Sequence, residues 1–145
     1  MQMTTQAKFV RDGSQVVNVA TAATLTCNDK FILLLDKKGK KVLYREGEGI
    51  AALFSDFKKV VKPDEEYGLV LDDGGFIDLR SVSTVFTSPK TGNLVVLSHD
   101  ERALYVFPKS TYKDIDGLSE SLLDVLVNVG PKKKISKIDW DAYKG

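Results

Sequence analysis

Residues 30–46 read KFILLLDKKGKKVLYRE, and residues 93–108 read NLVVLSHDERALYVFP. Each stretch is an apolar run, a short polar tip and a second apolar run. Apolar runs of four to eight residues on either side of a turn are typical of β-hairpins. The sequence therefore predicts two long hairpins, about sixty residues apart, and the rest of the chain is interpreted around them.

Strands and then a helix are expected in the first half of the chain. Residues 7–11 and 15–26 predict two strands joined by the tight turn at Asp12-Gly13, and FILLLD and VLY predict two more, with FILLLD central in its sheet. The period then changes to that of a helix in EGIAALFSDFKKVV, and Pro63 is expected to end this helix. Its apolar stripe consists of Ile50, Leu53, Phe54, Phe57, Val60 and Val61.

The second half repeats this order. An offset of sixty residues places FVRDGSQVVNV over LVLDDGGFIDL, and offsets of sixty-three and sixty-eight align the later strands and the helix. The second helix has an apolar stripe of Leu118, Leu122, Val125 and Val129, and Gly130-Pro131 is expected to end it. The prediction is an α+β fold in which two antiparallel ββββα repeats, residues 7–62 and 63–130, form two packed four-stranded sheets with two helices. Residues 1–6 are expected to be an N-terminal tail and residues 131–145 an extended C-terminal tail.

Composition narrows the class of protein. The chain has 145 residues, 43% of them hydrophobic, and lacks the run of about twenty apolar residues that a membrane helix needs. Its N-terminus does not have the pattern of a signal peptide. A single cysteine, Cys27, excludes an internal disulfide framework, and a single histidine, His99, leaves no ligand set for zinc. We expect a soluble, cytoplasmic protein with no metal.

Charge is distributed unevenly. Residues 1–62 carry a net charge of +5, residues 63–130 carry −7, and residues 131–145 carry +3. This asymmetry predicts separate roles for a basic first half, an acidic second half and a basic tail. Uneven surface charge with no functional meaning explains it equally well.

Catalytic patterns are weak. Cys27 and His99 fall in predicted turns, with nothing to bring them together. Residues 72–75, DDGG, resemble an acidic metal loop but lack the further oxygen ligands of a calcium site, so a hairpin turn explains them better. Gly47 and Gly49 lack the Lys and Ser/Thr of a phosphate loop. The sequence therefore predicts a protein that is not an enzyme and uses no cofactor.

Basic and aromatic residues gather at one hairpin tip and in the tail. Four lysines surround Gly39, with Tyr44 and Arg45 close behind, and four more lysines precede Trp140 and Tyr143 in the tail. Ammonium groups on a flexible tip can follow a phosphate backbone, and aromatic rings can stack on bases. Lysines also protect exposed hairpins from edge pairing, which is the simpler interpretation of one hairpin alone. Trp140 is expected either to pack as part of a C-terminal strap or to join the nucleic-acid site.

Short segments carry a resemblance to two related families. ALYVFPKSTYKDI (residues 103–115) and KFVRDGSQVVNV (residues 8–19) resemble the positive-cofactor-four transcriptional coactivators. KGKKVL (residues 38–43) is similar to the Lys-Gly-Lys motif of the Whirly proteins, which carry two copies of the repeat. Both families bind single-stranded DNA across their sheets and associate into oligomers. The chain departs from them in placing Lys-Gly-Lys in the second hairpin and in its acidic second repeat, and only Lys8 and Arg11 represent the coactivator's first-hairpin lysines.

The resemblance and the basic residues together predict a single-stranded DNA-binding protein, with RNA as an alternative ligand, acting in replication, recombination or transcription as a homodimer or larger oligomer. The alternative is a protein-interaction module that docks a partner through its acidic second repeat or its tail; such a module could be a phage-encoded inhibitor. The expected nucleic-acid-binding residues are Lys8, Arg11, Lys30, Lys37, Lys38, Lys40, Lys41, Tyr44, Arg45, Lys132, Lys133, Lys134 and Trp140.

Overall fold

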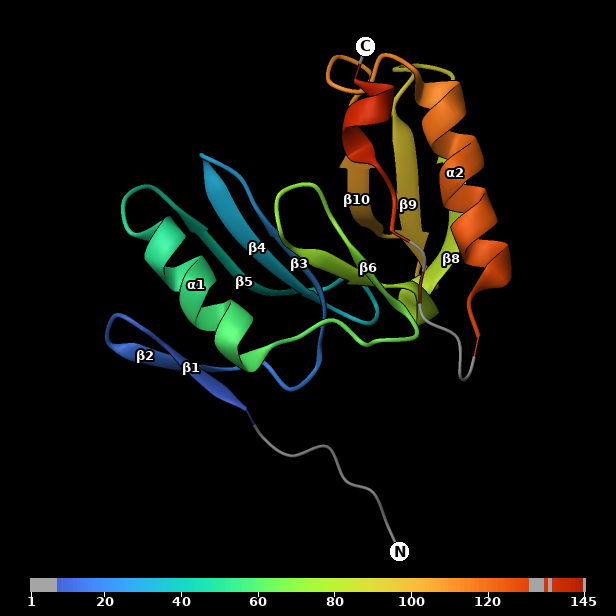
Figure 1. Ribbon diagram of the computed structural model, residues 1–145. Coiled ribbons are helices and arrows are strands. Elements are labelled where there is room, and N and C mark those ends of the chain that lie inside the picture. Colours follow the sequence, from blue (N-terminus) through green and yellow to red (C-terminus); the bar gives the residue numbers. More distant parts are fainter. Residues whose placement is uncertain (1–7, 131–134, 136, 145) are drawn as a thin grey trace, which may run out of the picture.

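Ten strands and two α-helices make up most of the described part of the chain, which confirms the predicted α+β class. The computed structural model describes residues 8–130, 135 and 137–144 (Figure 1). In chain order the elements are β1 (Phe9–Asp12), β2 (Gln15–Asn18), β3 (Ala22–Cys27), β4 (Phe31–Asp36), β5 (Lys41–Glu46), α1 (Ile50–Val60), β6 (Gly68–Val70), β7 (Phe76–Asp78), β8 (Val82–Thr87), β9 (Leu94–Ser98), β10 (Ala103–Phe107) and α2 (Ile115–Asn128).

The two long hairpins are parts of two three-stranded meanders with the same register. Strands β3–β4–β5 form the first meander and β8–β9–β10 the second. Matching Cα partners across the three strands are Leu25–Leu34–Leu43 in the first and Val85–Val96–Tyr105 in the second. Register shifts also occur at matching places, so the offset between the meanders is sixty for the first strand and sixty-two for the other two. The expected offset of sixty-three was wrong because the longer β8–β9 loop adds two residues, not three.

Each meander is preceded by a short hairpin, and the two hairpins lie differently. β6–β7 joins the first meander, because β7 pairs with β3 through Thr24–Ile77 and Leu25–Phe76. β1–β2 forms a two-stranded sheet of its own. The described strands therefore make a five-stranded sheet (order β5-β4-β3-β7-β6), a three-stranded sheet (β10-β9-β8) and a two-stranded sheet, and the expected pair of four-stranded sheets was wrong.

The expected strand at residues 15–26 is broken in the middle. β2 ends at Asn18, whose side chain accepts a hydrogen bond from the Ala20 amide, and β3 begins at Ala22. Between them Val19 is only 2% exposed and belongs to the core under α1. Val19 separates β2 from β3, so the first half contains five strands rather than four. In the second half a 3₁₀ turn at Leu79–Ser81 separates β7 from β8 in the same way.

Two hydrophobic cores hold these layers together. α1 packs on β1, β3 and β4 through the apolar stripe that its sequence predicts, with Phe57 fully buried. α2 covers the second meander through Leu118, Leu122 and Val125. Figure 1 shows the two helices on opposite sides of the molecule, with β1–β2 on the side of α1 that is remote from β8. Neither helix in the described ranges has the length and hydropathy required to span a membrane.

The C-terminal segment returns to the second core. Residues 140–143 form a 3₁₀ helix, so the expectation of a fully extended tail was wrong. Trp140 is 8% exposed and lies in a stacked arrangement with Phe107, their ring centroids 5.4 Å apart. The Tyr143 carbonyl accepts a hydrogen bond from the Asp114 amide, which ties the segment to the start of α2. Burial of a large aromatic ring is the main gain from this docking.

Candidate nucleic-acid interface

The tips of the two long hairpins contact each other. The Ser98 hydroxyl, at the β9–β10 turn, donates a hydrogen bond of 2.8 Å to the Lys38 carbonyl, at the β4–β5 turn. Gly39 lies against this second tip with a φ of +83°, and a Cβ built on it would lie 2.9 Å from the Cβ of Arg102. A glycine is required here because only glycine combines a left-handed backbone with so close an approach.

The two turns are also built alike. The Asp36 carboxylate accepts hydrogen bonds from the amides of Lys38 and Lys40, two and four residues later. The Ser98 hydroxyl accepts from the amides of Asp100 and Arg102 at the same spacing. Local side-chain bonds of this kind fix a turn without help from the core. The shape of the lysine-bearing tip is therefore set by Asp36 and by its contact with the second hairpin.

The lysines of this tip point to solvent. Lys37, Lys38, Lys40 and Lys41 are all exposed, and none of the ion pairs found among the described residues involves them. Three of the four line a hollow of about 350 Å³ beside Ala20 and Thr21. Four ammonium groups within five residues outnumber the single carboxylate of Asp36, which lines the same hollow, and leave a local positive potential that attracts phosphates.

An aromatic pair lies on the same two strands as the basic tip. The rings of Phe31 on β4 and Tyr44 on β5 have centroids 5.6 Å apart and a tilt of 31°. Tyr44 is 41% exposed, and its Cα partner in the register is Leu33. The four positions from Leu33 to Lys37 correspond to roughly 13 Å along a strand. That length matches about four stacked nucleotides, so lysines and rings lie within reach of one short single strand.

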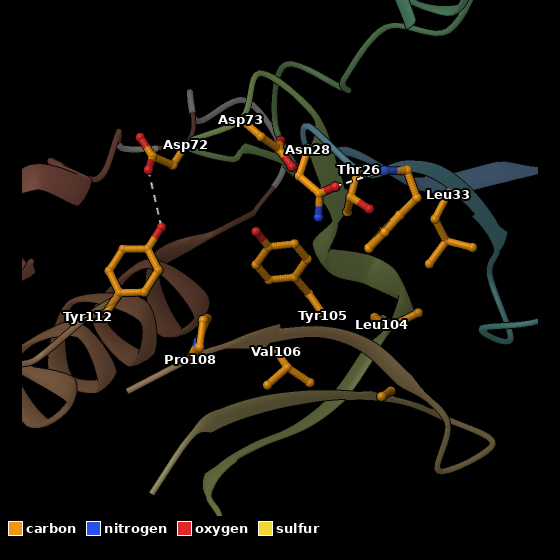
Figure 2. A pocket seen from close by; sticks show the side chains of 12 residues that line it. Thr26, Asn28, Leu33, Asp72, Asp73, Leu104, Tyr105, Val106, Pro108 and Tyr112 are labelled. Carbon is orange, nitrogen blue, oxygen red and sulfur yellow. Dashed lines mark hydrogen bonds between the residues drawn. The ribbon is translucent and has the colours of Figure 1, made fainter. Parts of the chain in front are cut away.

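A pocket of about 480 Å³ opens beside this pair, between the open face of the five-stranded sheet and β10. Thr26, Phe31 and Leu33 line it on one side, and residues 103–106 line it on the other. Figure 2 shows the Tyr105 ring in the pocket, with its hydroxyl directed toward the side that carries Asn28 and Asp73. The pocket combines apolar walls with a few polar groups, which is typical of a site for a flat, partly polar ligand.

Polar groups of the pocket are partly neutralised. Asp72 forms an ion pair with Lys144 and accepts a hydrogen bond of 3.4 Å from the Tyr112 hydroxyl (Figure 2). Asp73 accepts hydrogen bonds from the amides of Gly75 and Cys27, yet burial outweighs them and raises the pKa of its carboxyl. Burial, followed by the charge of Asp72, raises the pKa of Tyr112 to about 12. The tyrosine and carboxyl oxygens here can pair with the amino and imino groups of a base.

Several expected site residues lie elsewhere or are occupied. Arg45 forms an ion pair with Asp12 that crosses from β5 to the β1–β2 turn, so its guanidinium is not a free cation. Lys8 and Arg11 are exposed on the separate β1–β2 hairpin, and Lys30 is exposed at the β3–β4 turn next to Phe31. Trp140 is buried, and its ring is not available for stacking on a base. The expected contacts of Lys132, Lys133 and Lys134 lie outside the described residues.

The pocket itself was missed by sequence reasoning. Phe31 was assigned to a central strand with no functional role, and Asp72 and Asp73 were interpreted only as turn residues. That turn is present, since the Leu71 amide donates to the Gly75 carbonyl. The one available signal was that FILLLD is apolar on both faces of the predicted strand, which predicts that a second surface covers its outer face.

Comparisons with protein-family models, with curated proteins and with solved structures give no match to this chain. Within the described residues no three His, Cys, Asp or Glu side chains are grouped so that they could hold a metal ion.

Proposed function

We propose that this chain is a non-enzymatic, cytoplasmic single-stranded DNA-binding protein, and that it is built from two related halves as the resemblance to coactivator and Whirly proteins implies. The strand lies along β4 and β5. Its phosphates meet the basic tip at residues 37–41, and its bases stack on Tyr44 and Phe31. Such a protein would act in replication, recombination or transcription.

One observation carries the proposal: four unpaired lysines and an aromatic pair, the exposed Tyr44 and the partly exposed Phe31, occupy the same hairpin within the length of a few nucleotides. Positive charge that follows the backbone, combined with rings that accept any base, is the usual design of proteins that bind single strands without sequence preference. The neighbouring pocket supports it, because its apolar walls and the side-chain oxygens of Asn28, Asp72 and Asp73 suit a base ring with polar edges.

The test is a titration of a fluorescent oligothymidine by anisotropy at several salt concentrations. Replacing Lys37, Lys38, Lys40 and Lys41 together by Ser should weaken binding. It should also reduce the slope of log affinity against log salt by about 3, because each phosphate contact on a single strand contributes about 0.7. Tyr44→Ala should weaken binding by roughly 5- to 150-fold, the equivalent of about 1–3 kcal/mol for one lost stacking contact.

A matched control removes the same charge elsewhere. Lys59, Lys62, Lys90 and Lys113 are exposed and lie away from this hairpin, so their replacement by Ser should change the salt slope much less. Equal losses in the two quadruple variants would reduce the effect to net charge and refute the assignment of the tip. Absence of binding by the intact protein at low salt would refute the function itself.

A second candidate rests on α2. Leu123 and Val127 are 44% and 77% exposed, and Glu120 and Asp124 flank them in a shallow surface hollow. An apolar strip with acidic borders suits a basic amphipathic helix of a protein partner. If this surface is the functional one, replacing Leu123 and Val127 by Ser abolishes partner binding, whereas replacing the tip lysines leaves it intact.

A further inference from the structure

Among the described strands, β8 has one unpaired edge, whereas the matching strand of the first meander, β3, is paired on both sides. β3 pairs with β4 on one side and with β7 on the other. β8 is the matching strand of the second meander, but in the described part of the chain its backbone hydrogen bonds run only to β9. Phe86 on this strand is 39% exposed. Unpaired edges of this kind are ready templates for a further strand.

The pairing of β7 with β3 indicates which strand would pair with the open edge of β8. β7 leads into β8 over three residues, 79–81, and β2 leads into β3 over three residues, 19–21. The two meanders share one register, so β2 precedes the first meander in the same way as β7 precedes the second. β7 pairs with the first strand of the opposite meander, and the same relation directs β2 to β8. Transferring the β3–β7 register by sixty residues places Val17 opposite Thr84 and Val16 opposite Val85.

β2 is free to accept a partner. Its outer edge carries no strand among the described residues, and Val16 is 60% exposed. The hairpin is nevertheless fixed in its own chain, because Val10 is 4% exposed in the core under α1 and Asp12 is paired with Arg45. Figure 1 shows this hairpin remote from β8. The outer edge of β2 is therefore open to a strand of a second copy.

We infer that β2 of one copy pairs antiparallel with β8 of a second copy, in the register Val16–Val85 and Val17–Thr84. Each copy offers one β2 and one β8, so two such contacts related by a twofold axis close a dimer. Neither strand carries a charged side chain, so no like charges oppose each other in this pairing. This assembly does not rest on the nucleic-acid function proposed above.

Cysteine cross-linking tests the register. In a Cys27→Ala background, chains carrying Val16→Cys are mixed with chains carrying Val85→Cys and exposed to a mild oxidant. Paired residues in antiparallel strands have Cα atoms about 4.5–5.5 Å apart, which lies within the range of disulfides. We expect a disulfide-linked dimer from this mixture. The matched control pairs Val16→Cys with Val70→Cys, because Val70 is 46% exposed on the edge strand β6, which the inference leaves unpaired.

Three results would overturn the inference. Equal cross-linking in the control mixture would show random collision. A monomeric disulfide in a single chain that carries both Val16→Cys and Val85→Cys would place the contact within one copy. A sedimentation equilibrium mass of only 16 kDa for the unmodified protein at micromolar concentration would show that no copies associate.

Discussion

Gly39 provides a direct test of the contact between the two hairpin tips. Gly39→Ala adds one methyl group where the backbone has a φ of +83° and where Arg102 Cβ would lie 2.9 Å away, with Ser98 Oγ at 3.3 Å. The left-handed backbone costs an alanine roughly 1–2 kcal/mol. The close contact adds about 1–3 kcal/mol, because the opposing atoms belong to a rigid turn. The expected loss in the free energy of unfolding is about 2–5 kcal/mol.

Gly47→Ala is the matched control. Gly47 has a similar φ of +90°, but no atom lies within 4 Å of a Cβ built there. The backbone cost and the change in unfolded-chain entropy are therefore shared, and they cancel in the difference between the two variants. Urea unfolding followed by the fluorescence of Trp140, the single tryptophan, measures both. Gly39→Ala should be less stable than Gly47→Ala by about 1–3 kcal/mol. A difference below about 0.5 kcal/mol would refute the tip contact.

Two further predictions concern stability. Arg45→Met should lower the free energy of unfolding at neutral pH, because it leaves the buried Asp12 carboxylate without its ion-pair partner. Arg45 holds the pKa of Asp12 below 3.8, so the stabilisation is present above that pH and is lost as the pH falls below it. Urea titrations should therefore show the stabilities of the unmodified protein and of Arg45→Met converging in acid. A difference that stays constant with pH would contradict the ion pair. Trp140→Ala should cost about 3 kcal/mol through loss of the stacked Phe107 contact, measured by thermal unfolding, and a loss below about 1 kcal/mol would show that the C-terminal segment does not stabilise the second core.

Much of the local structure follows from the sequence. The helix over residues 50–60 and its buried stripe are set by 3.6-residue spacing, and the turns at Asp12-Gly13 and around Gly39 by residues that favour such backbones. The exposed lysines of the tip were also predicted, because charged groups on a short turn have no route into a core. Each of these features depends on residues within about ten positions of one another.

The tertiary structure decided which strands are neighbours. β7 joins β3 rather than β8, although only three residues separate it from β8. Arg45 pairs with Asp12 across thirty-three positions, which removes it from the basic site. The pocket requires β4, the turn at residues 72–73 and β10 to meet. Hydrogen-bonding strand edges are chemically alike, so a strand's own sequence specifies its faces but not its partner. The favoured pairing is the one that buries Val19, Ile77 and Trp140 together with the apolar faces of the two helices. That choice depends on the whole chain at once.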